Sequence, residues 1–195
     1  MKCLLINIVV FVTTVNSDTS KSLFLPQLPV GKYRINYLGM MRCVSGRSNE
    51  KIQFNLYLSK KSTNTTEIKG NITIYVPIDD SLNFEVNMAV KDSIGGWKEN
   101  AFFYKSPKAC STLRKYVGDA WIPLLQSAGV NNTNCPFQVG YYESTGIDTD
   151  VFNAANFPKT FFYGTYRLRF FCTKNNEVYG CFTVVLEIKR PWETN

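Results

Sequence analysis

Residues that could carry out catalysis are scarce in this chain. Its 195 residues include no histidine, which excludes histidine-dependent triads, histidine acid–base catalysis and histidine-ligated metals. Close carboxylate pairs occur at Asp79 with Asp80 and at Asp148 with Asp150, each beside turn-like sequence. This placement favours solvated turn residues over the paired carboxylates of a glycosidase. We therefore expect no catalytic residues, no metal site, no cofactor and no enzyme activity.

Phosphate-containing partners are also disfavoured. Gly95 and Gly96 precede Trp97, and this pattern favours a hairpin turn over a phosphate-binding loop. The formal net charge is +7, but the basic residues are scattered singly or in pairs along the chain. Dispersed charge of this kind predicts no nucleic-acid partner.

The first 17 residues have the pattern of a secretory signal peptide. A short basic start precedes an apolar run at residues 3–15, and small or branched residues at 15–17 suit signal peptidase. The alternative is a short buried strand, because the run is too short for a membrane span. We expect cleavage after Ser17 and a single secreted domain at residues 18–195.

Secretion makes the cysteines and the glycosylation triplets informative. An oxidising compartment favours disulfides over metal ligation. The cysteines after the signal peptide are odd in number, so at least one is free or pairs elsewhere; they are Cys43, Cys110, Cys135, Cys172 and Cys181. Three triplets of the Asn-x-Ser/Thr type predict N-glycosylation, at Asn64, Asn71 and Asn131.

Alternation of apolar and polar residues dominates the rest of the sequence. Residues 52–58 and 82–90 alternate cleanly, so each predicts a strand with one buried face. Less regular patterns predict further strands at 33–41, 68–76 and 97–104, and a C-terminal hairpin of 165–172 with 178–188.

One segment instead has helical spacing. Ser106 and Pro107 offer an N-cap and a first-turn proline, and apolar residues then recur at helical spacing as far as Trp121. Pro123 is expected to end or kink this helix. The elements together predict a mostly β fold, an antiparallel β-sandwich or β-cup with one helical insert and a hydrophobic cavity.

Aromatic residues gather in a segment with loop-forming residues. Residues 157–164 hold four aromatic side chains together with a proline and a glycine. Exposed aromatic rings are costly unless they cover the core or meet an apolar partner, so this segment is either core cover or a lipid-facing rim. Residues 121–125 form a second apolar patch with the same two interpretations. If the sandwich is open along one edge and both patches lie at its mouth, the result would be a hydrophobic cup.

The candidate wall and rim residues of such a cup are apolar. Each strand residue among them would equally suit ordinary core packing. They are Phe84, Val86, Met88, Val90, Trp97, Phe102, Trp121, Leu125, Phe152, Phe161 and Phe162.

An ordered set of short motifs resembles the ganglioside activator family, the lipid-transfer members of the ML-type lipid-recognition β-cup proteins. The C-terminal motifs are Cys135-Pro136-Phe137, Gly140, Tyr142, Gly164-Thr165-Tyr166-Arg167-Leu168, Gly180-Cys181-Phe182 and Ile188-Lys189. The upstream motifs are Gly70-Asn71-Ile72-Thr73, Gly96-Trp97 and Ile122-Pro123. The likeness covers residues 43–189, and the chain's length and N-terminal extension also resemble the insect chemosensory branch of this family, which is proposed to carry hydrophobic pheromones.

The resemblance implies the disulfides Cys43–Cys181 and Cys110–Cys135, with Cys172 left over. Strand geometry leaves a competitor open, Cys172–Cys181 across the C-terminal hairpin. The family's remaining cysteine pairs are missing from this sequence. Thr160 and Phe161 stand where the activator has a Trp-Leu pair in its rim loop, so ganglioside specificity is not implied.

The resulting hypothesis is a secreted lipid-binding or lipid-transfer protein that holds a lipid or apolar small molecule, such as a pheromone, in a hydrophobic cup. The alternative is a secreted interaction protein or receptor accessory subunit without carrier activity. Expected partners are the lipid itself, transiently an anionic membrane surface, and a receptor or hydrolase. The expected location is extracellular, with the lysosomal lumen as the alternative.

Overall fold

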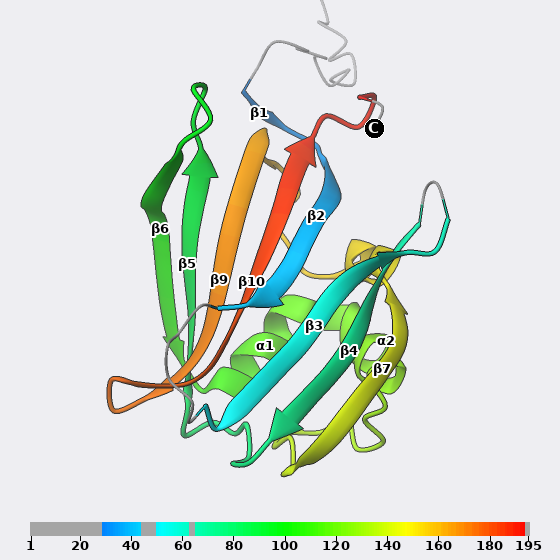
Figure 1. Ribbon diagram of the computed structural model, residues 1–195, viewed down its shortest axis with the longest axis vertical. Coiled ribbons are helices and arrows are strands. Elements are labelled where there is room, and N and C mark those ends of the chain that lie inside the picture. Colours follow the sequence, from blue (N-terminus) through cyan, green and yellow to red (C-terminus); the bar gives the residue numbers. More distant parts are fainter. Residues whose placement is uncertain (1–28, 44–49, 63–64, 194–195) are drawn as a thin grey trace, which may run out of the picture.

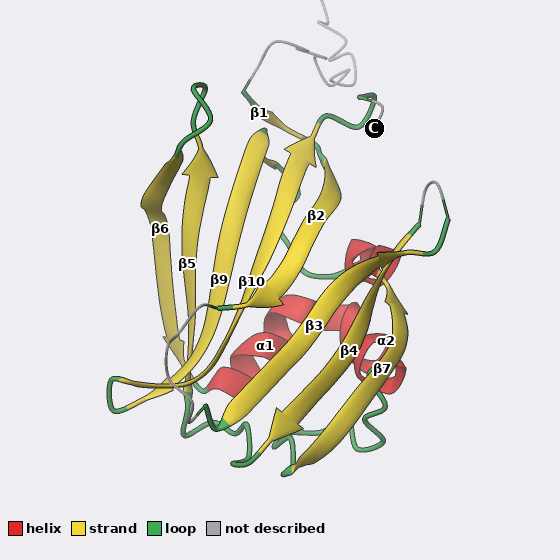
Figure 2. Ribbon diagram, viewed as in Figure 1, coloured by secondary structure: helices red, strands yellow, loops and turns green. Residues whose placement is uncertain are grey.

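The computed structural model describes residues 29–43, 50–62 and 65–193, and confirms the expected mostly β fold of antiparallel sheets with one helical insert (Figures 1 and 2). The expected signal peptide at 1–17 and the glycosylation triplet at Asn64 lie outside these described residues.

The elements follow one another in a simple order. The strands are β1 (Val30–Gly31), β2 (Arg34–Arg42), β3 (Ile52–Lys60), β4 (Thr66–Ile74), β5 (Asn83–Lys91), β6 (Trp97–Pro107), β7 (Gly140–Asp148), β8 (Phe161–Phe162), β9 (Gly164–Lys174) and β10 (Glu177–Lys189). The helical elements are α1 (Ala109–Val117), η1 (Gly118–Ala120), α2 (Trp121–Ser127) and η2 (Thr149–Ala154).

Two sheets form the body of the molecule. The larger has five strands in the order β2-β10-β9-β5-β6, and the smaller has three in the order β3-β4-β7. A third, two-stranded sheet joins β1 to β8. Figure 1 shows the two main sheets diverging, with the five-stranded sheet extending upward beyond the three-stranded one.

The five-stranded sheet has one apolar and one polar face, as alternation requires. Phe84 on β5 lies opposite Cys172 on β9, and Val86 lies opposite Phe170. Glu85, between Phe84 and Val86, projects to the opposite face of the sheet. There the Lys105 ammonium lies 2.7 Å from the Glu85 carboxylate. We call the face that carries Phe84 and Phe170 the inner face.

The main core fills the space between the lower inner face, the three-stranded sheet and the helical insert. Its buried members come from both sheets and from α1 and α2, and include Ile52, Phe54, Ile68, Ile74, Phe84, Cys110, Trp121, Leu125, Phe137 and Cys172. Gly180 on β10 allows β3 to approach closely, because an added Cβ would lie 2.6 Å from the Ile52 carbonyl oxygen. Because α1 and α2 contribute residues to this core, the helical insert forms part of the second layer over the five-stranded sheet (Figure 2).

The helical insert differs in detail from the sequence prediction. Pro107 is the last residue of β6, and α1 begins at Ala109 rather than directly after Ser106. The break in the helix comes at Gly118, which has φ 58°, a value that glycine adopts without strain. Pro123 lies in the first turn of α2, where no intrahelical amide bond is lost, so it neither ends nor kinks that helix.

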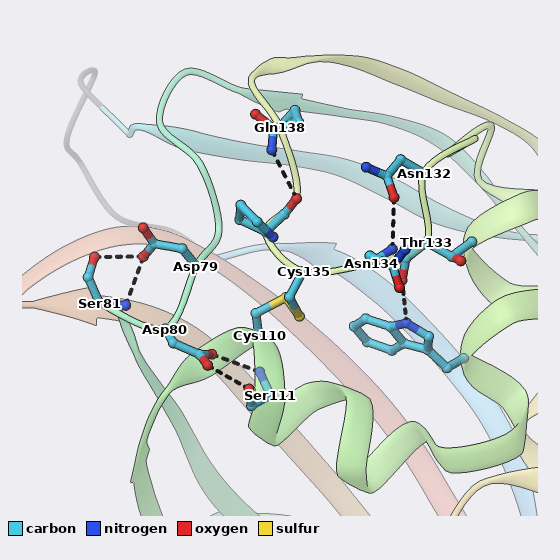
Figure 3. Close-up of a disulfide and its surroundings, with 12 residues drawn as sticks. Asp79, Asp80, Ser81, Cys110, Ser111, Asn132, Thr133, Asn134, Cys135 and Gln138 are labelled. Atoms are coloured by element: carbon cyan, nitrogen blue, oxygen red, sulfur yellow. Dashed lines mark hydrogen bonds between the residues drawn. A yellow bond between two sulfur atoms is a disulfide. The ribbon is translucent and has the colours of Figure 1, made fainter.

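The start of α1 is capped from a distant turn. The Ser111 amide donates to Asp80 Oδ1 at 2.9 Å, and the Ser111 hydroxyl donates to Asp80 Oδ2 at 2.6 Å (Figure 3). The neighbouring Asp79 carboxylate accepts from the Ser81 amide at 2.8 Å. Asp79 therefore has the turn role that the sequence favoured for this pair, and Asp80 has a helix-capping role that the sequence analysis did not predict.

Both disulfides implied by the resemblance are present, and the competitor is wrong. Arg42 pairs with Phe182, so the next residues, Cys43 and Cys181, come together at a Cα–Cα distance of 5.5 Å. Cys110 on α1 joins Cys135 at 5.9 Å (Figure 3). Cys172 cannot bond to Cys181 because adjacent register positions project to opposite faces of the sheet.

Removal of the distant cap should destabilise the fold. Asp80→Ala should lower the free energy of unfolding by about 1 kcal/mol, whereas Asp80→Asn, which keeps an oxygen acceptor, should lose less than about half of that. The hydrogen bonds from Ser111 lower the pKa of Asp80. The stabilisation should therefore be present above about pH 4 and be lost as pH falls through the folded-state pKa. Urea unfolding measures both effects, and equal losses in the two variants would contradict the capping role.

Candidate functional site

The inner face of the five-stranded sheet changes character along its length. At one end Phe84 and Cys172 are buried in the main core. Further along the same strands, Met88 lies opposite Leu168 and Val90 lies opposite Tyr166. Of these four, only Tyr166 is fully buried. The apolar pattern thus continues beyond the well-buried part of the sheet.

A second apolar cluster occupies this farther end. Its buried members are Tyr166, Val184, Leu186 and Ile188. The partly buried side chains packed on it are Tyr33, Ile35, Tyr37, Met40, Met88, Val90, Phe161, Tyr163, Leu168, Phe170 and Phe182. Among the described residues none of its members belongs to β3, β4, β7, α1 or α2. We call this part of the inner face the open half, because neither the smaller sheet nor the helical insert covers it.

Side chains from β1, β8 and the adjoining turns form the rim of the open half. The Phe161 ring makes edge contacts with Tyr33 and Tyr166, at centroid distances of 6.2 and 5.6 Å. The Tyr166 hydroxyl donates to the Phe162 carbonyl at 3.0 Å. The Phe162 side chain itself is 59% exposed. The segment predicted as an aromatic loop therefore contains a short strand that sends one ring inward and the next outward.

The edge strand β6 adds one more exposed ring. Phe102 lies opposite Met88, so its side chain shares the inner face, and it is 52% exposed. Among the predicted wall and rim residues, the structure therefore gathers Met88, Val90, Phe102 and Phe161 around the open half, with Phe162 just outside the rim.

The other predicted site residues lie elsewhere. Phe84 and Val86 pack in or against the main core, as do Trp121 and Leu125. The patch at 121–125 is thus divided, because Ile122 between these two buried residues is 51% exposed. The Trp121 indole nitrogen donates to the Thr133 carbonyl at 2.8 Å (Figure 3).

Trp97 departs from the expected cup. It lies on the outer face, where the Arg167 guanidinium is 4.5 Å from the centre of its ring. Phe152, in η2, instead lies at the border of the two clusters: it packs against the main core and also contacts Tyr37 of the second cluster, at a ring distance of 6.0 Å.

Several open-half residues were missed by the sequence analysis. Leu168, Phe170, Val184 and Leu186 lie on the strands of the C-terminal hairpin, which was predicted as strands without assigning its faces. Alternation within 165–172 and 178–188 was the signal that could have identified them.

Ionisable chemistry is sparse at this face. Burial raises the pKa of Tyr37 well above its usual range, with smaller contributions from Tyr33 and Asp150, so this phenol stays protonated. Among the described residues no three potential metal ligands cluster together. None of the described helices is long and apolar enough to cross a membrane. The open half can therefore offer apolar contact and a few hydroxyl groups.

The sequence was compared with protein-family models and with curated proteins. No protein-family model matches the chain, and no curated protein matches its sequence significantly.

The buried thiol at the closed end of the inner face should be inert. Burial raises the pKa of Cys172 to about 12, so at pH 8 the thiol stays protonated and is a poor nucleophile. In a chain of residues 18–195, which lacks Cys3, a thiol reagent such as Ellman's reagent should not label Cys172 in the folded protein and should label it after unfolding in guanidinium. The variant Ser93→Cys, in the exposed β5–β6 turn, is the positive control and should react at once. Rapid labelling of folded wild-type protein would contradict this burial.

Proposed function

We propose that this chain is a secreted carrier that holds a lipid or similarly apolar small molecule against the open half. The observation that supports the proposal is the incomplete covering of an apolar sheet face. Met88, Val90 and Leu168 are only half-buried, although their strands continue without interruption from the main core. Apolar surface that is left partly uncovered in this way, next to the exposed ring of Phe102, is typical of binding faces.

The energetics suit a ligand of this class. Burial of one methylene group contributes about 0.8 kcal/mol, so a 16-carbon chain would gain on the order of 10 kcal/mol before the costs of binding. This affinity requires neither a metal nor a charged group in the wall.

Secretion and glycosylation belong to the same proposal. The two disulfides are typical of an oxidising compartment. Asn131 is exposed just after α2. Asn71 is on β4, where its Oδ1 accepts a hydrogen bond from Asn55 Nδ2 at 2.9 Å, an arrangement that leaves the Asn71 nitrogen available for a glycan. We propose that both triplets are glycosylated and that the protein works outside the cell or in the lysosomal lumen.

A membrane would be the source from which such a carrier collects its ligand. Phe162 is exposed beside the rim, and Ile94 at the β5–β6 turn is 92% exposed. Exposed Lys159 lies close to Phe162 in sequence. Apolar side chains next to positive charge favour contact with an anionic bilayer.

A bulky residue in the open half should block ligand binding. Val90→Trp would fill the space over Tyr166 and should weaken binding of a long-chain fluorescent probe at least about tenfold. The matched control is Val185→Trp, because Val185 pairs with Gly39 on the outer face and should leave probe binding unchanged. Val90→Trp should also cost little stability, whereas overpacking of a filled core costs about 1–3 kcal/mol. Absence of saturable probe binding to the wild-type protein would favour the interaction-protein alternative instead.

Membrane contact should depend on the outward ring of the rim. Phe162→Ser should reduce binding to vesicles that contain anionic lipid, and wild-type binding should fall as salt is raised. Tyr141→Ser removes another exposed aromatic side chain, from β7 of the smaller sheet, and should have no effect. Co-sedimentation with vesicles measures the difference. Equal binding by the two variants would show that Phe162 is not the contact.

A further inference from the structure

The strand β6 forms an edge of the five-stranded sheet. It pairs with β5 on one side, and none of the described strands pairs with its other side. Figure 1 shows β6 as the outermost strand on the left of this sheet, whereas the opposite edge strand, β2, lies next to β3 of the smaller sheet. The unpaired backbone amide and carbonyl groups of such an edge can bind another strand. The partner that this edge fits is therefore an extended strand.

Three consecutive aromatic residues occupy the middle of this edge. Phe102 projects to the inner face and Phe103 to the outer face, and the two side chains are 52% and 55% exposed. Tyr104 is on the inner face again, where its ring makes an edge contact with Tyr116 of α1 at a centroid distance of 5.8 Å. Adjacent exposed rings on both faces of an unpaired strand suit a partner strand, because a strand covers both faces at once.

The two ends of β6 limit where a partner strand can pair. Near its start the pairing with β5 is irregular, and Asn100 has φ 54°. Its last residue, Pro107, has no amide hydrogen to donate. Both features are typical of edges that resist pairing. The segment that remains available for a partner strand is 101–106.

We propose that the partner is a second copy of this chain, paired antiparallel through residues 101–105 of β6 about a two-fold axis at Phe103. This register places the two Phe103 side chains opposite each other on the outer face. It also places Phe102 of each copy opposite Tyr104 of the other on the inner face. Cross-strand aromatic pairs of this kind are favourable. The edge is therefore complementary to itself.

The other symmetric registers fit less well. An axis at Phe102 would bring the irregular residue Asn100 into the paired segment. An axis at Tyr104 would place Phe102 opposite Ser106, so that two aromatic pairs would be lost. The axis at Phe103 is therefore the one that the sequence of the edge favours.

The favoured register also avoids contact between like charges. Lys105 lies opposite Ala101 of the second copy, and its ammonium is 2.7 Å from the Glu85 carboxylate of its own copy. The two Lys105 positions would be about 14 Å apart, which exceeds the Debye length of about 8 Å at physiological salt. The paired segments therefore add little charge repulsion.

The second layers of the two copies are complementary as well. α1 follows β6 directly and packs near its end, beside Tyr104. Nearer its start, β6 borders the open half, which the helical insert does not cover. Antiparallel pairing brings the covered end of one copy next to the uncovered end of the other. The second copy would thus form a side wall of the open half at Phe102. The interface stands on the edge alone, whereas this role as a wall rests on the proposed carrier function.

The oligomeric state tests the interface. Protein of residues 18–195 should form a reversible dimer with a Kd on the order of 10 µM, as expected of a small interface. Phe103→Lys would place two like charges opposite each other and should weaken the dimer at least about tenfold. The control Tyr141→Lys makes the same change at an exposed aromatic side chain on β7 and should leave the dimer unchanged. Sedimentation velocity measures all three. A monomeric wild-type protein at about twenty times that concentration, or equal weakening in the two variants, would overturn the inference.

Single cysteines test the position of the axis. Phe103→Cys should give a cross-linked dimer on mild oxidation, because the two Cβ atoms would lie about 5 Å apart. The two positions of Ala101→Cys would lie about 14 Å apart, so this variant should not cross-link at the same concentration. Non-reducing gel electrophoresis measures the difference, and equal cross-linking of the two variants would overturn the proposed register.

A long-chain fluorescent probe separates the interface from the carrier function. Phe103→Lys should weaken probe binding about threefold at protein concentrations above the dimer Kd, because the open half loses the apolar contact of the second copy. Unchanged probe binding by the monomeric variant would overturn the role as a wall. A wild-type protein that dimerises but binds no probe would overturn the carrier function and leave the interface standing.

Discussion

A row of four phenylalanine rings joins the two main sheets, and the rest of the structure depends on where it lies. Phe84 packs on Phe170 at 6.1 Å, Phe170 on Phe182 at 4.9 Å, and Phe182 on Phe54 at 4.9 Å. The row crosses β5, β9 and β10 and ends on β3 of the smaller sheet. Stacked and tilted rings at these distances are mutually attractive and bury large apolar areas. On one side of this row the sandwich is closed, and on the other the inner face continues without the smaller sheet above it.

This arrangement follows from a mismatch between the layers. Five long strands present more apolar surface than three strands and two short helices can cover. The helical insert completes the main core, where Trp121, Leu125 and Cys110 are buried. Among the described residues, Tyr33, Phe161, Tyr163 and their neighbours shield the farther end. A filled core and an incompletely covered apolar face therefore coexist on the same strands.

The sequence predicts most of the strands but only part of the site, for identifiable reasons. Alternation located β3, β5 and the C-terminal hairpin because each has one buried face. It missed β7, whose buried residues are Ser144 and Ile147. Ser144 is polar, with its hydroxyl bonded to the Ile68 carbonyl at 3.0 Å, and a register shift between these two positions interrupts the alternation. The face on which Trp97 lies could not be deduced, because an irregularity opposite Met88 and Val90, with Asn100 at φ 54°, interrupts the alternation of β6. Which half of the inner face is covered depends on how the helical insert packs against the sheet. The alternation of apolar and polar residues within single strands does not predict this packing.

The two disulfides of the described residues lie in or next to the main core and not in the open half. Cys110–Cys135 ties the helical insert down within the main core, and Cys43–Cys181 joins β2 to β10 next to Phe182 of the aromatic row. Beyond the row, the described part of the open half contains no disulfide and is held by strand hydrogen bonds, aromatic packing and side-chain hydrogen bonds such as that from the Tyr166 hydroxyl to the Phe162 carbonyl. Since local stability varies within a fold, the cross-linked half can stay rigid while the rim opens at lower cost. The carrier function that we propose would require this combination, because a ligand would have to enter and leave without unfolding the core.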